Sequence, residues 1–510
     1  MQIPNERRYD VVGMGGSTLD RFTVVKEFPT GREVQEAVSM ISDGGGPVST
    51  ALAVVGRFGG KALMLDRLGD DDVTQTILDD FKTYNVSTDG ILRVPGAHAG
   101  CAIILVKEST GERAIFFTRT TAPELTAEDL KTCTLSQTTT APGTASTLAD
   151  ADASTTFTLA DAIRNAKIFH CNGRHSAALP AAIAIAKEAG TLVSFDGGAN
   201  RYSPTQRKWA ESADIAIVAK EFADRYTEAD DGTLAADPLE AARRLHAKGV
   251  SLAGVTVGAK GSYLILPDGE EIFCPPFQRD HVVDTTGCGD SYHGAFLYAL
   301  CAGYEPKEAI KLASAVGALN TRAVGGRRGL PTRLEAEAQA KAAAEEAARL
   351  EAEAQQAALA AQTAAISAEE LKLLANIIYC EAGSESYVGK VAVGNVIMNR
   401  VKSASQPNTI TEVVYAKGQF SPVRNGSLQR ALSSDKADAA CYQAAIEALA
   451  GAQPVGGKLF FAGNGQRNGL DGIVHATRDA VAAGTTVQVP SDWLDGPSAA
   501  DLEDAIPANL

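Results

Sequence analysis

Short apolar runs alternate with helical patterns from residue 9 to about residue 333, and no other feature restricts the fold as strongly. The runs include DVVGMG, CAIILV, TLVSFDGG, DIAIVA and LAGVTVG, each about the length of one buried strand. Strands that alternate with helices are joined by right-handed crossovers, so their sheet is mostly parallel and has helices on both faces. The sequence therefore predicts a doubly wound α/β domain over residues 1–333.

One segment interrupts this alternation, at about residues 121–160. It contains LSQTTTAPGTASTLADADASTTFT, which is rich in Thr, Ala and Ser and poor in large apolar residues. A segment of this composition buries too little apolar surface to offset the entropy that it would lose on ordering. We therefore expect a flexible surface insertion at this place.

A helical linker is predicted for residues 334–366. These residues are almost all Ala, Glu, Gln, Lys, Arg or Leu, with no Gly or Pro, and such residues lose the least on entering a helix. A coiled coil is the weaker interpretation because the heptads are irregular. Ser367, followed three residues later by Glu370, indicates the start of a new helix. A second, smaller and mainly α domain is therefore expected over residues 367–510.

Composition excludes several classes of protein. The net charge of −15 argues against binding to nucleic acid or to a membrane surface, because either needs a basic face, although it still allows a local basic site. The eight cysteines form no CxxC pairs, which argues against zinc and against a disulfide framework. The first residues carry charges where a signal peptide has an apolar core, and no apolar run is long enough to span a bilayer. We therefore expect a cytoplasmic protein.

The run VVDTTGCGDSYHGAFLYAL joins a Gly-bearing turn, which begins at Asp284, to a buried helix. The free N–H groups of Gly287, Cys288 and Gly289 would converge before the helix and favour an anion. A carboxylate at Asp290 could take a proton from an attacking hydroxyl, as phosphoryl transfer requires. The alternative is that Asp290 only caps the helix.

The same run closely resembles the second signature of the ribokinase-like, PfkB-type carbohydrate kinases. The resemblance extends to DGGGPVSTALAVVGRFGGKALMLDRLGDD, VTVGAKGSYLI and GGRRGLP, which occur in the family's order. It implies a ribokinase-like fold and transfer of phosphate from ATP, with Mg²⁺, to a sugar. In this family the base falls on Asp290, and the N–H groups of residues 287–289 form the anion hole.

The resemblance also implies further site residues. The sugar side falls on Asp20, Gly45, Gly46 and Ser49. The nucleotide side falls on Gly258, Lys260, Gly261 and Asn320, and a monovalent cation such as K⁺ would lie near Asp284. On spacing alone, a turn-forming role for Asp20 is equally consistent. The run GMGGST lacks the third glycine of a dinucleotide fingerprint, so an NAD site is excluded.

Two departures from the family pattern concern substrate and metal. Gly46 and Ser49 stand where many members have Asn in the glycine motif, and Ala-Lys-Glu-Phe at 219–222 stands where many have Asn-x-x-Glu. With HCNGRH at 170–175, this segment resembles the ketohexokinase and sulfofructose-kinase branch, which favours a ketose. The histidines show no metal spacing and are interpreted as packed or exposed residues. Cys288 is either an oxidisable thiol or a packing residue.

The second domain has its own candidate acid. In the run LLANIIYCEAGSESYVGKVAVGNVIMNRV, Glu381 ends a helix with an apolar face of leucines and isoleucines. Apolar surroundings keep a carboxyl group protonated near neutrality, as the general acid of a glycosidase requires. The alternative is an exposed glutamate at a helix end.

This run, together with PNTITEVVYAKGQFSPVRNG and PVGGKLFFAGNG, resembles the SleB-type cell-wall hydrolases over about residues 370–480. The resemblance implies a mainly helical, lysozyme-like fold, with Glu381 as catalytic acid, Glu385 as its neighbour, and Gln419 and Phe420 lining a glycan cleft. A single acid fits a lytic transglycosylase better than a two-carboxylate enzyme. The ending HATRDAVAAGTTVQVPSDWL departs from the family pattern.

The two expected substrates lie on opposite sides of a membrane. The hydrolase part either acts on imported wall fragments, acts only on lysis, or is an inactive domain that binds or is presented by the linker. A fourth alternative is that the chain is an engineered or erroneous gene fusion. We favour a sugar kinase, with a homodimer as one possible assembly and peptidoglycan as a second ligand. The rival hypotheses are a glycan-cleaving enzyme with the kinase half as passenger, and a non-catalytic sugar sensor.

Overall fold

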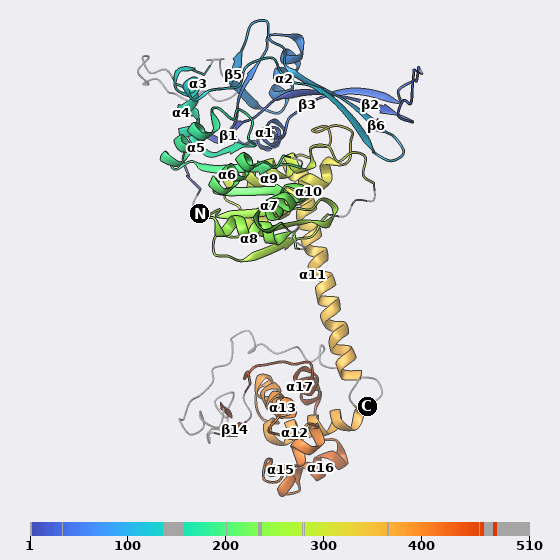
Figure 1. Cartoon of the computed structure of the whole chain (residues 1–510). Helices are drawn as coiled ribbons and strands as arrows, with labels where there is room; N and C mark the ends of the chain where they lie inside the picture. The colour runs from blue at the N-terminus through green and yellow to red at the C-terminus, as the bar shows by residue number, and fades with distance from the viewer. Residues whose placement is uncertain are drawn as a thin grey trace. The chain divides into compact units, whose positions relative to one another are not determined.

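The chain folds into two compact units, Met1–Glu345 and Glu346–Leu510, each with its own hydrophobic core. The computed structural model, drawn in Figure 1, describes residues 3–32, 34–135, 157–199, 201–232, 237–277, 279, 281–364 and 367–457. It also describes the backbone of strands β14 (Phe460–Gly463) and β15 (Ile473–Ala476), which form an antiparallel pair.

A nine-stranded sheet organises the first unit. Its spatial order is β13 (Glu271–Cys274), β12 (Ser262–Ile265), β11 (Leu252–Thr256), β10 (Ile215–Ala219), β9 (Leu192–Gly197), β8 (Ala166–Cys171), β1 (Tyr9–Met14), β4 (Ala62–Leu68) and β5 (Val86–Arg93). Every neighbouring pair is parallel except the two that include β12. The strand order reverses between β1 and β8, and α/β proteins bind ligands at the carboxyl ends of the strands beside such a reversal. The predicted mostly parallel α/β sheet is confirmed.

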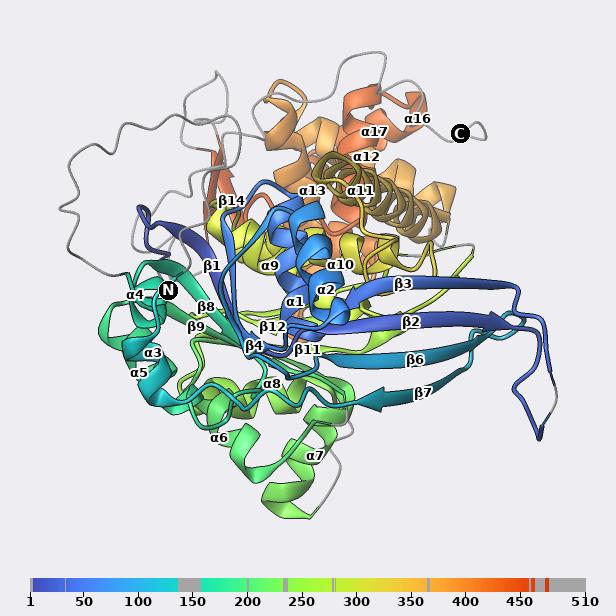
Figure 2. The same cartoon turned by 90° about the horizontal axis from the view of Figure 1, so that it is seen from above.

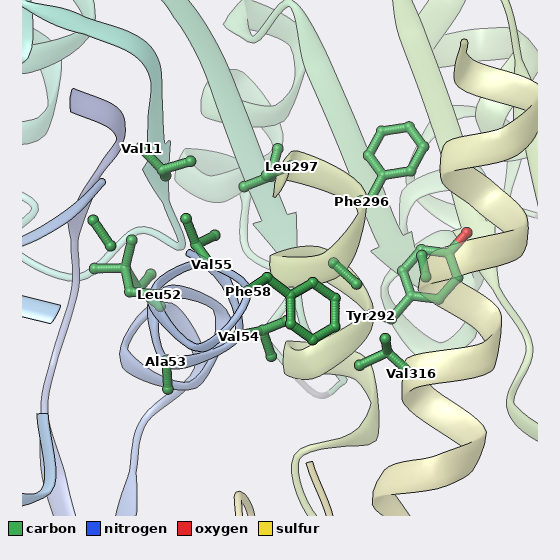
Figure 3. Close-up of a cluster of buried hydrophobic side chains, with 14 of the residues drawn as sticks. Val11, Leu52, Ala53, Val54, Val55, Phe58, Tyr292, Phe296, Leu297 and Val316 are labelled. Carbon is green, nitrogen blue, oxygen red and sulfur yellow. The ribbon is translucent and has the colours of Figure 1, made fainter. Parts of the chain in front are cut away.

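Helices cover both faces of this sheet. Val11 and Val12 are neighbours in β1 and enter different cores, because successive strand residues point to opposite faces. One face carries α1 (Pro47–Arg57), α2 (Asp72–Thr83), α9 (Cys288–Cys301) and α10 (Pro306–Asn320). The other carries α3 (Ala127–Thr132), α4 (Leu159–Arg164), α5 (Leu179–Glu188), α6 (Pro204–Ser212), α7 (Lys220–Asp231) and α8 (Leu239–Ala247). Figure 3 shows Phe58, which directly follows α1, packed beside α9, which carries Phe296.

A second sheet, which the sequence did not predict, has the order β3 (Ser39–Gly45), β2 (Thr18–Val25), β6 (Gly100–Lys107) and β7 (Arg113–Thr118). Figure 2 shows these strands projecting away from the large sheet. Residues directly opposite each other share a face. On one face Phe22 and Ile104 are buried, although Ile115 and Phe117 of the edge strand β7 on this face are 56% and 66% exposed. On the other face Met40, Ile103 and Phe116 are 74%, 48% and 62% exposed.

The expected insertion at about residues 121–160 has ordered ends. Helices α3 and α4 each begin with a capping box, formed by Thr126 with Asp129 and by Thr158 with Asp161. Both helices place leucines in the core. The Thr/Ala/Ser-rich part of the insertion, residues 136–156, lies outside the described residues.

The linker is helical, as predicted: α11 (Arg333–Ala364) is one continuous helix. Ser367 caps the next helix, since its hydroxyl accepts a hydrogen bond from the Glu370 N–H at 3.2 Å. The second unit contains α12 (Ala368–Ala382), α13 (Tyr387–Lys402), α14 (Ile410–Tyr415), α15 (Ser421–Arg424), α16 (Ser427–Ser434) and α17 (Ala439–Leu449), and is mainly helical as expected. Most of the divergent ending lies outside the described residues. Among the described helices, none is long and apolar enough to cross a membrane.

Candidate functional site

The candidate phosphate site lies at the N-terminus of α9. Gly287 precedes the helix in the left-handed region, with φ 72°, and a Cβ there would lie 2.5 Å from the carbonyl oxygen of Gly326. Only glycine fits this position without strain. The N–H groups of the first helical residues, among them Cys288 and Gly289, have no partner within the helix. The Cys288 N–H makes a 3.4 Å bond to the Thr285 carbonyl oxygen, outside the helix, and the geometry of the helix start is consistent with an anion site.

Asp290 is the third residue of α9, and the helix cap is Gly287, so Asp290 is not the N-cap. Burial raises the pKa of the Asp290 carboxyl to about 6, and the charge of Asp196 adds to this effect. A carboxylate with a pKa near neutrality can both accept and release a proton during catalysis. Asp290 thus combines the position and the proton affinity that a general base needs.

Two buried polar residues hold the loop before α9. The Oδ1 atom of Asp284 accepts hydrogen bonds from the N–H and hydroxyl of Thr286, at 2.9 and 2.8 Å, and its Oδ2 accepts one from the Gly325 N–H at 3.0 Å. Asn320 donates to the carbonyl oxygens of Thr286 and Gly326, at 3.3 and 3.0 Å. Because Asn320 is fully buried, it supports the loop, and the expected nucleotide contact is corrected.

Arg327 belongs to the motif GGRRGLP, in the loop after α10, and contacts the sugar-side glycine motif. Its N–H donates to Asp43 Oδ2 at 2.8 Å, and its guanidinium donates to the Gly45 carbonyl at 3.2 Å. The guanidinium also pairs with Asp80 and is completely buried. Sequence reasoning noted the motif but assigned Arg327 no role, because its partners lie far away in the chain.

Asp20 and Gly45, which are both expected on the sugar side, lie next to each other. Asp20 Oδ1 accepts a hydrogen bond from the Thr18 hydroxyl at 3.0 Å, and burial raises the pKa of the Asp20 carboxyl. A Cβ on Gly45 would lie 2.3 Å from Asp20 Oδ2, so only glycine leaves room for the carboxylate. The pair keeps a half-buried carboxylate available for sugar hydroxyls.

Gly46 and Ser49 hold the backbone instead of facing a substrate. Gly46 has φ 95°, and a Cβ there would lie 2.1 Å from the carbonyl oxygen of Gly16. Ser49 is fully buried, and its hydroxyl donates to the same Gly16 oxygen at 3.3 Å. Both residues fix the turn between β1 and β2, so the expected direct sugar contact by Ser49 is corrected.

The expected nucleotide residues follow β11. Gly258–Lys260 form a short 3₁₀ turn, and Gly258 and Gly261 both have positive φ. The side chain of Lys260 is exposed. Because β11 is parallel to the central strands, this turn lies at the same edge of the sheet as the carboxyl ends of β8 and β9.

Two further findings concern the anion loop. Burial, with the charges of Asp284 and Asp290, raises the pKa of the Cys288 thiol to about 12, which favours the packing role over a reactive thiolate. Arg113 of β7 lies 3.5 Å from Asp284 Oδ1 and donates to the hydroxyls of Thr285 and Thr286. No local pattern indicated Arg113, because its contact joins strand β7 to the loop before α9, which lies far away in the chain.

In the second unit, Glu381 is the penultimate residue of α12 and is half-buried. Burial raises the pKa of its carboxyl, as predicted for a general acid. The buried Lys390 donates to the carbonyl oxygens of Gly383 and Glu385, at 3.2 and 2.9 Å. Lys390 therefore fixes the turn that follows Glu381, a role that its sequence position did not indicate.

The two expected cleft residues differ in exposure. Gln419 is exposed, whereas Phe420 is only 3% exposed, packs in the core and lies under the Arg400 guanidinium. Phe420 therefore supports the fold, and of this pair only Gln419 is accessible to a glycan. An open pocket lined by Lys402, Gln406 and Glu412 lies at the opposite end of α13 from the Glu381 turn.

Comparisons with known proteins match both parts of the chain. The family model "pfkB family carbohydrate kinase" matches residues 11–333, and the model "Cell Wall Hydrolase" matches residues 384–479. A fructokinase of Solanum tuberosum is 28% identical over 351 residues, which are 64% of this chain and 94% of the relative. A 5-dehydro-2-deoxygluconokinase of Shouchella clausii is 31% identical over 190 residues, which are 34% of this chain and 57% of the relative.

A solved structure shows the same fold. Ribokinase of Arabidopsis thaliana, determined with ribose and ATP, has a TM-score of 0.52 and 21% identity. The match covers 65% of this chain and 99% of that chain. The predicted ribokinase-like α/β fold is therefore confirmed.

Proposed function

The chain belongs to the pfkB family of carbohydrate kinases, and on this basis we propose that it transfers the γ-phosphate of ATP to a sugar hydroxyl, with a ketose as the preferred acceptor. The observation that carries the proposal is Asp290, a carboxyl group with a pKa of about 6 at the N-terminus of α9. The fructokinase relative supports a ketose. We assign the kinase to residues 1–333, the linker to 334–366 and the hydrolase part to 367–510.

In the proposed reaction, Asp290 accepts the proton of the attacking sugar hydroxyl. A bond forms between that oxygen and the γ-phosphorus while the bond to the bridging oxygen breaks, and ADP leaves with the bridging oxygen. The N–H groups at Gly287, Cys288 and Gly289 stabilise the charge on the transferring group. Asp20 orients the sugar by accepting hydrogen bonds from its other hydroxyls.

Gly258, Lys260 and Gly261 are proposed to contact ATP. Mg²⁺ neutralises phosphate charge when it is bound with the nucleotide. In the described parts of the chain, no group of three or more His, Cys, Asp or Glu residues could hold a metal. This fits an ion whose ligands are mainly phosphates and water, since Mg²⁺ in kinases is usually bound in this way.

A potassium ion beside Asp284 is a further part of the proposal. The Asp284 carboxylate is buried and offers oxygen ligands, but the Arg113 guanidinium already lies 3.5 Å away. Rates are to be compared in KCl and in choline chloride at equal ionic strength. Stimulation by K⁺ supports the site, and equal rates would mean that Arg113 alone balances the charge of Asp284.

The kinase is tested by ADP release from the full-length protein with ATP, Mg²⁺ and a panel of ketoses, aldoses and nucleosides. Asp290→Asn keeps the shape of the side chain but removes the base, and should reduce sugar-dependent turnover by at least about 100-fold. Asp268→Asn, at an exposed turn, is the matched control and should keep full activity. Turnover that survives in Asp290→Asn would contradict the assignment.

The second candidate function is cleavage of peptidoglycan by the C-terminal part, with Glu381 as acid and Glu385 and Gln419 near the glycan. The raised pKa of the Glu381 carboxyl favours it. Release of muropeptides from purified cell wall should stop in Glu381→Gln. It should continue in Glu369→Gln, an exposed glutamate of the same helix. Products without a reducing end would support a lytic transglycosylase.

We also propose a homodimer and a cytoplasmic location. The exposed apolar face with Met40, Ile103 and Phe116 is suited to a second copy of the chain, since such faces usually mark interfaces. Phe116→Lys should lower the mass measured by light scattering. Phe117→Lys should not, because Phe117, although 66% exposed, lies on the opposite face of the same strand. A cytoplasmic location is proposed because the kinase reaction consumes ATP.

A further inference from the structure

A cluster of buried ionisable residues lies beside the first two turns of α9. His293 follows Asp290 by three residues, so both lie on the same side of the helix. His293 Nε2 lies 3.3 Å from Asp196 Oδ1, near the carboxyl end of β9, and both side chains are buried. The ring of His170, from β8, has its centroid 5.6 Å from that of His293. The cluster thus joins the helix that carries Asp290 to the ends of two central strands.

The cluster pairs one imidazole with one carboxylate and places a second, buried imidazole beside them. Burial is the largest influence on Asp196 and opposes its ionisation, but His293, Arg201 and His170 together outweigh burial and hold the pKa of Asp196 below its ordinary value. Burial and the charge of His293 lower the pKa of His170 to about 3, so His170 is neutral. His170 Nδ1 lies 3.1 Å from the Ser194 hydroxyl, and its Nε2 has no hydrogen-bond partner among the described residues.

Asp290 faces charges from several elements. Beyond burial, the anion that opposes its ionisation is Asp196, at the end of β9. Three cationic groups favour its ionisation: Arg201 in the loop after β9, His293 in α9 and Arg327 in the loop after α10. Asp284 and Cys288 also lie at the start of α9, where the pKa of Cys288 is high and its thiol is uncharged. The Asp196–His293 pair therefore contributes one charge of each sign to the surroundings of Asp290.

We propose that Asp196 and His293 form a positioning pair for the base, which fixes the start of α9 against β8 and β9 and sets the proton affinity of Asp290 with two opposite charges. This inference rests on the proposed kinase function. A role in stability alone is the poorer explanation, because a buried ion pair usually contributes no more stability than well-packed apolar residues would.

The test is the pH dependence of kcat/KM for the full-length kinase with ATP, Mg²⁺ and its best sugar. His293→Gln removes a cation that favours the Asp290 carboxylate, so the acidic limb should move to higher pH by about one unit. Asp196→Asn removes an anion that opposes the carboxylate, so the limb should move to lower pH. His170→Asn changes a neutral side chain of the same cluster, and should leave the limb where it is.

Shifts of opposite sign cannot come from a general loss of packing. The proposal would be overturned if the acidic limb of the pH profile stayed in place in both Asp196→Asn and His293→Gln, or if it moved in the same direction in both. Circular dichroism and thermal unfolding identify any variant that does not fold, and His293→Asn is a second replacement for that case. An equal shift in His170→Asn would also count against the pair.

A second readout separates this proposal from the kinase assignment. The carboxyl carbon of Asp290 can be titrated by ¹³C NMR in the wild type and in each variant, with Asp290→Asn to assign the signal. The Asp290 pKa should rise in His293→Gln and fall in Asp196→Asn, whether or not a sugar is phosphorylated. If Asp290→Asn keeps full sugar-kinase activity, the proposed function fails, whereas an unmoved Asp290 titration refutes the pair.

Discussion

Gly287 offers the sharpest structural prediction, because its replacement by Ala disturbs the anion loop in two ways. Its φ of 72° lies in the left-handed region, which costs a residue with a Cβ about 1–2 kcal/mol. The new Cβ would also lie 2.5 Å from the Gly326 carbonyl oxygen, and ordinary contact begins at 3.4 Å. The backbone at Gly326 must therefore move by about 0.9 Å, and a misplacement of about 1 Å at an active site can lower a rate about 100-fold.

The matched control is Gly289→Ala in the same loop. Its φ is not in the left-handed region, and a Cβ there meets no protein atom within 4 Å. Since alanine favours a helix over glycine by about 1 kcal/mol, this variant should be as stable as the wild type or more stable. Thermal unfolding of the full-length protein should give a lower midpoint for Gly287→Ala only, with kcat reduced about 100-fold. Equal midpoints for Gly287→Ala and wild type would refute the reasoning.

Three further predictions concern the same site. Because the raised pKa of Asp290 is about 6, protonation should remove the base as the pH falls, and log kcat/KM should decline with a slope of one below about pH 6, measured as a pH–rate profile. Arg113→Met should lower kcat/KM by about tenfold or more, because hydrogen bonds from a charged group contribute about 1.5–3 kcal/mol. Asn320→Leu leaves two carbonyl oxygens without their donor and should cost about 1–3 kcal/mol in thermal unfolding.

The α/β fold could be predicted because its signal is local. Each central strand is a short apolar run, and neighbours such as Val11 and Val12 supply opposite faces of one sheet. The linker was equally clear, because the helix preference of α11 does not depend on tertiary packing. The start of α9 was predicted for the same reason: its turn, N–H groups and carboxylate lie within seven residues of one another, between Asp284 and Asp290.

The rest of the site depends on contacts that no local pattern encodes. Arg327 donates a hydrogen bond to the Gly45 carbonyl, and Arg113 lies close to Asp284. In both contacts the two residues are far apart in the sequence. The second sheet was missed because its strand β6 has the same apolar character as those of the first sheet, whereas β2 and β3 are mixed in polarity, so pairing alone identifies the sheet. Ser49 has a suitable chemical type for a site, but packing buries it, and burial is decided by tertiary structure.

The sequence already indicates that His293 lies near Asp290. His293 lies three residues later in a predicted helix, and this spacing already places the two side chains on one side. What the sequence could not supply was Asp196, which gives His293 its charge partner. The strand order beside the switch between β1 and β8 therefore decides which charged residues surround the base.

The most direct test of the central claim is detection of the phosphorylated sugar itself. Full-length protein, ATP, Mg²⁺ and D-fructose are incubated together, and fructose phosphate is measured by ³¹P NMR in the wild type and in Asp290→Asn. The account predicts a sugar phosphate with the wild type and none with the variant. Folded wild-type protein that phosphorylates neither fructose nor any other ketose, aldose or nucleoside would contradict it.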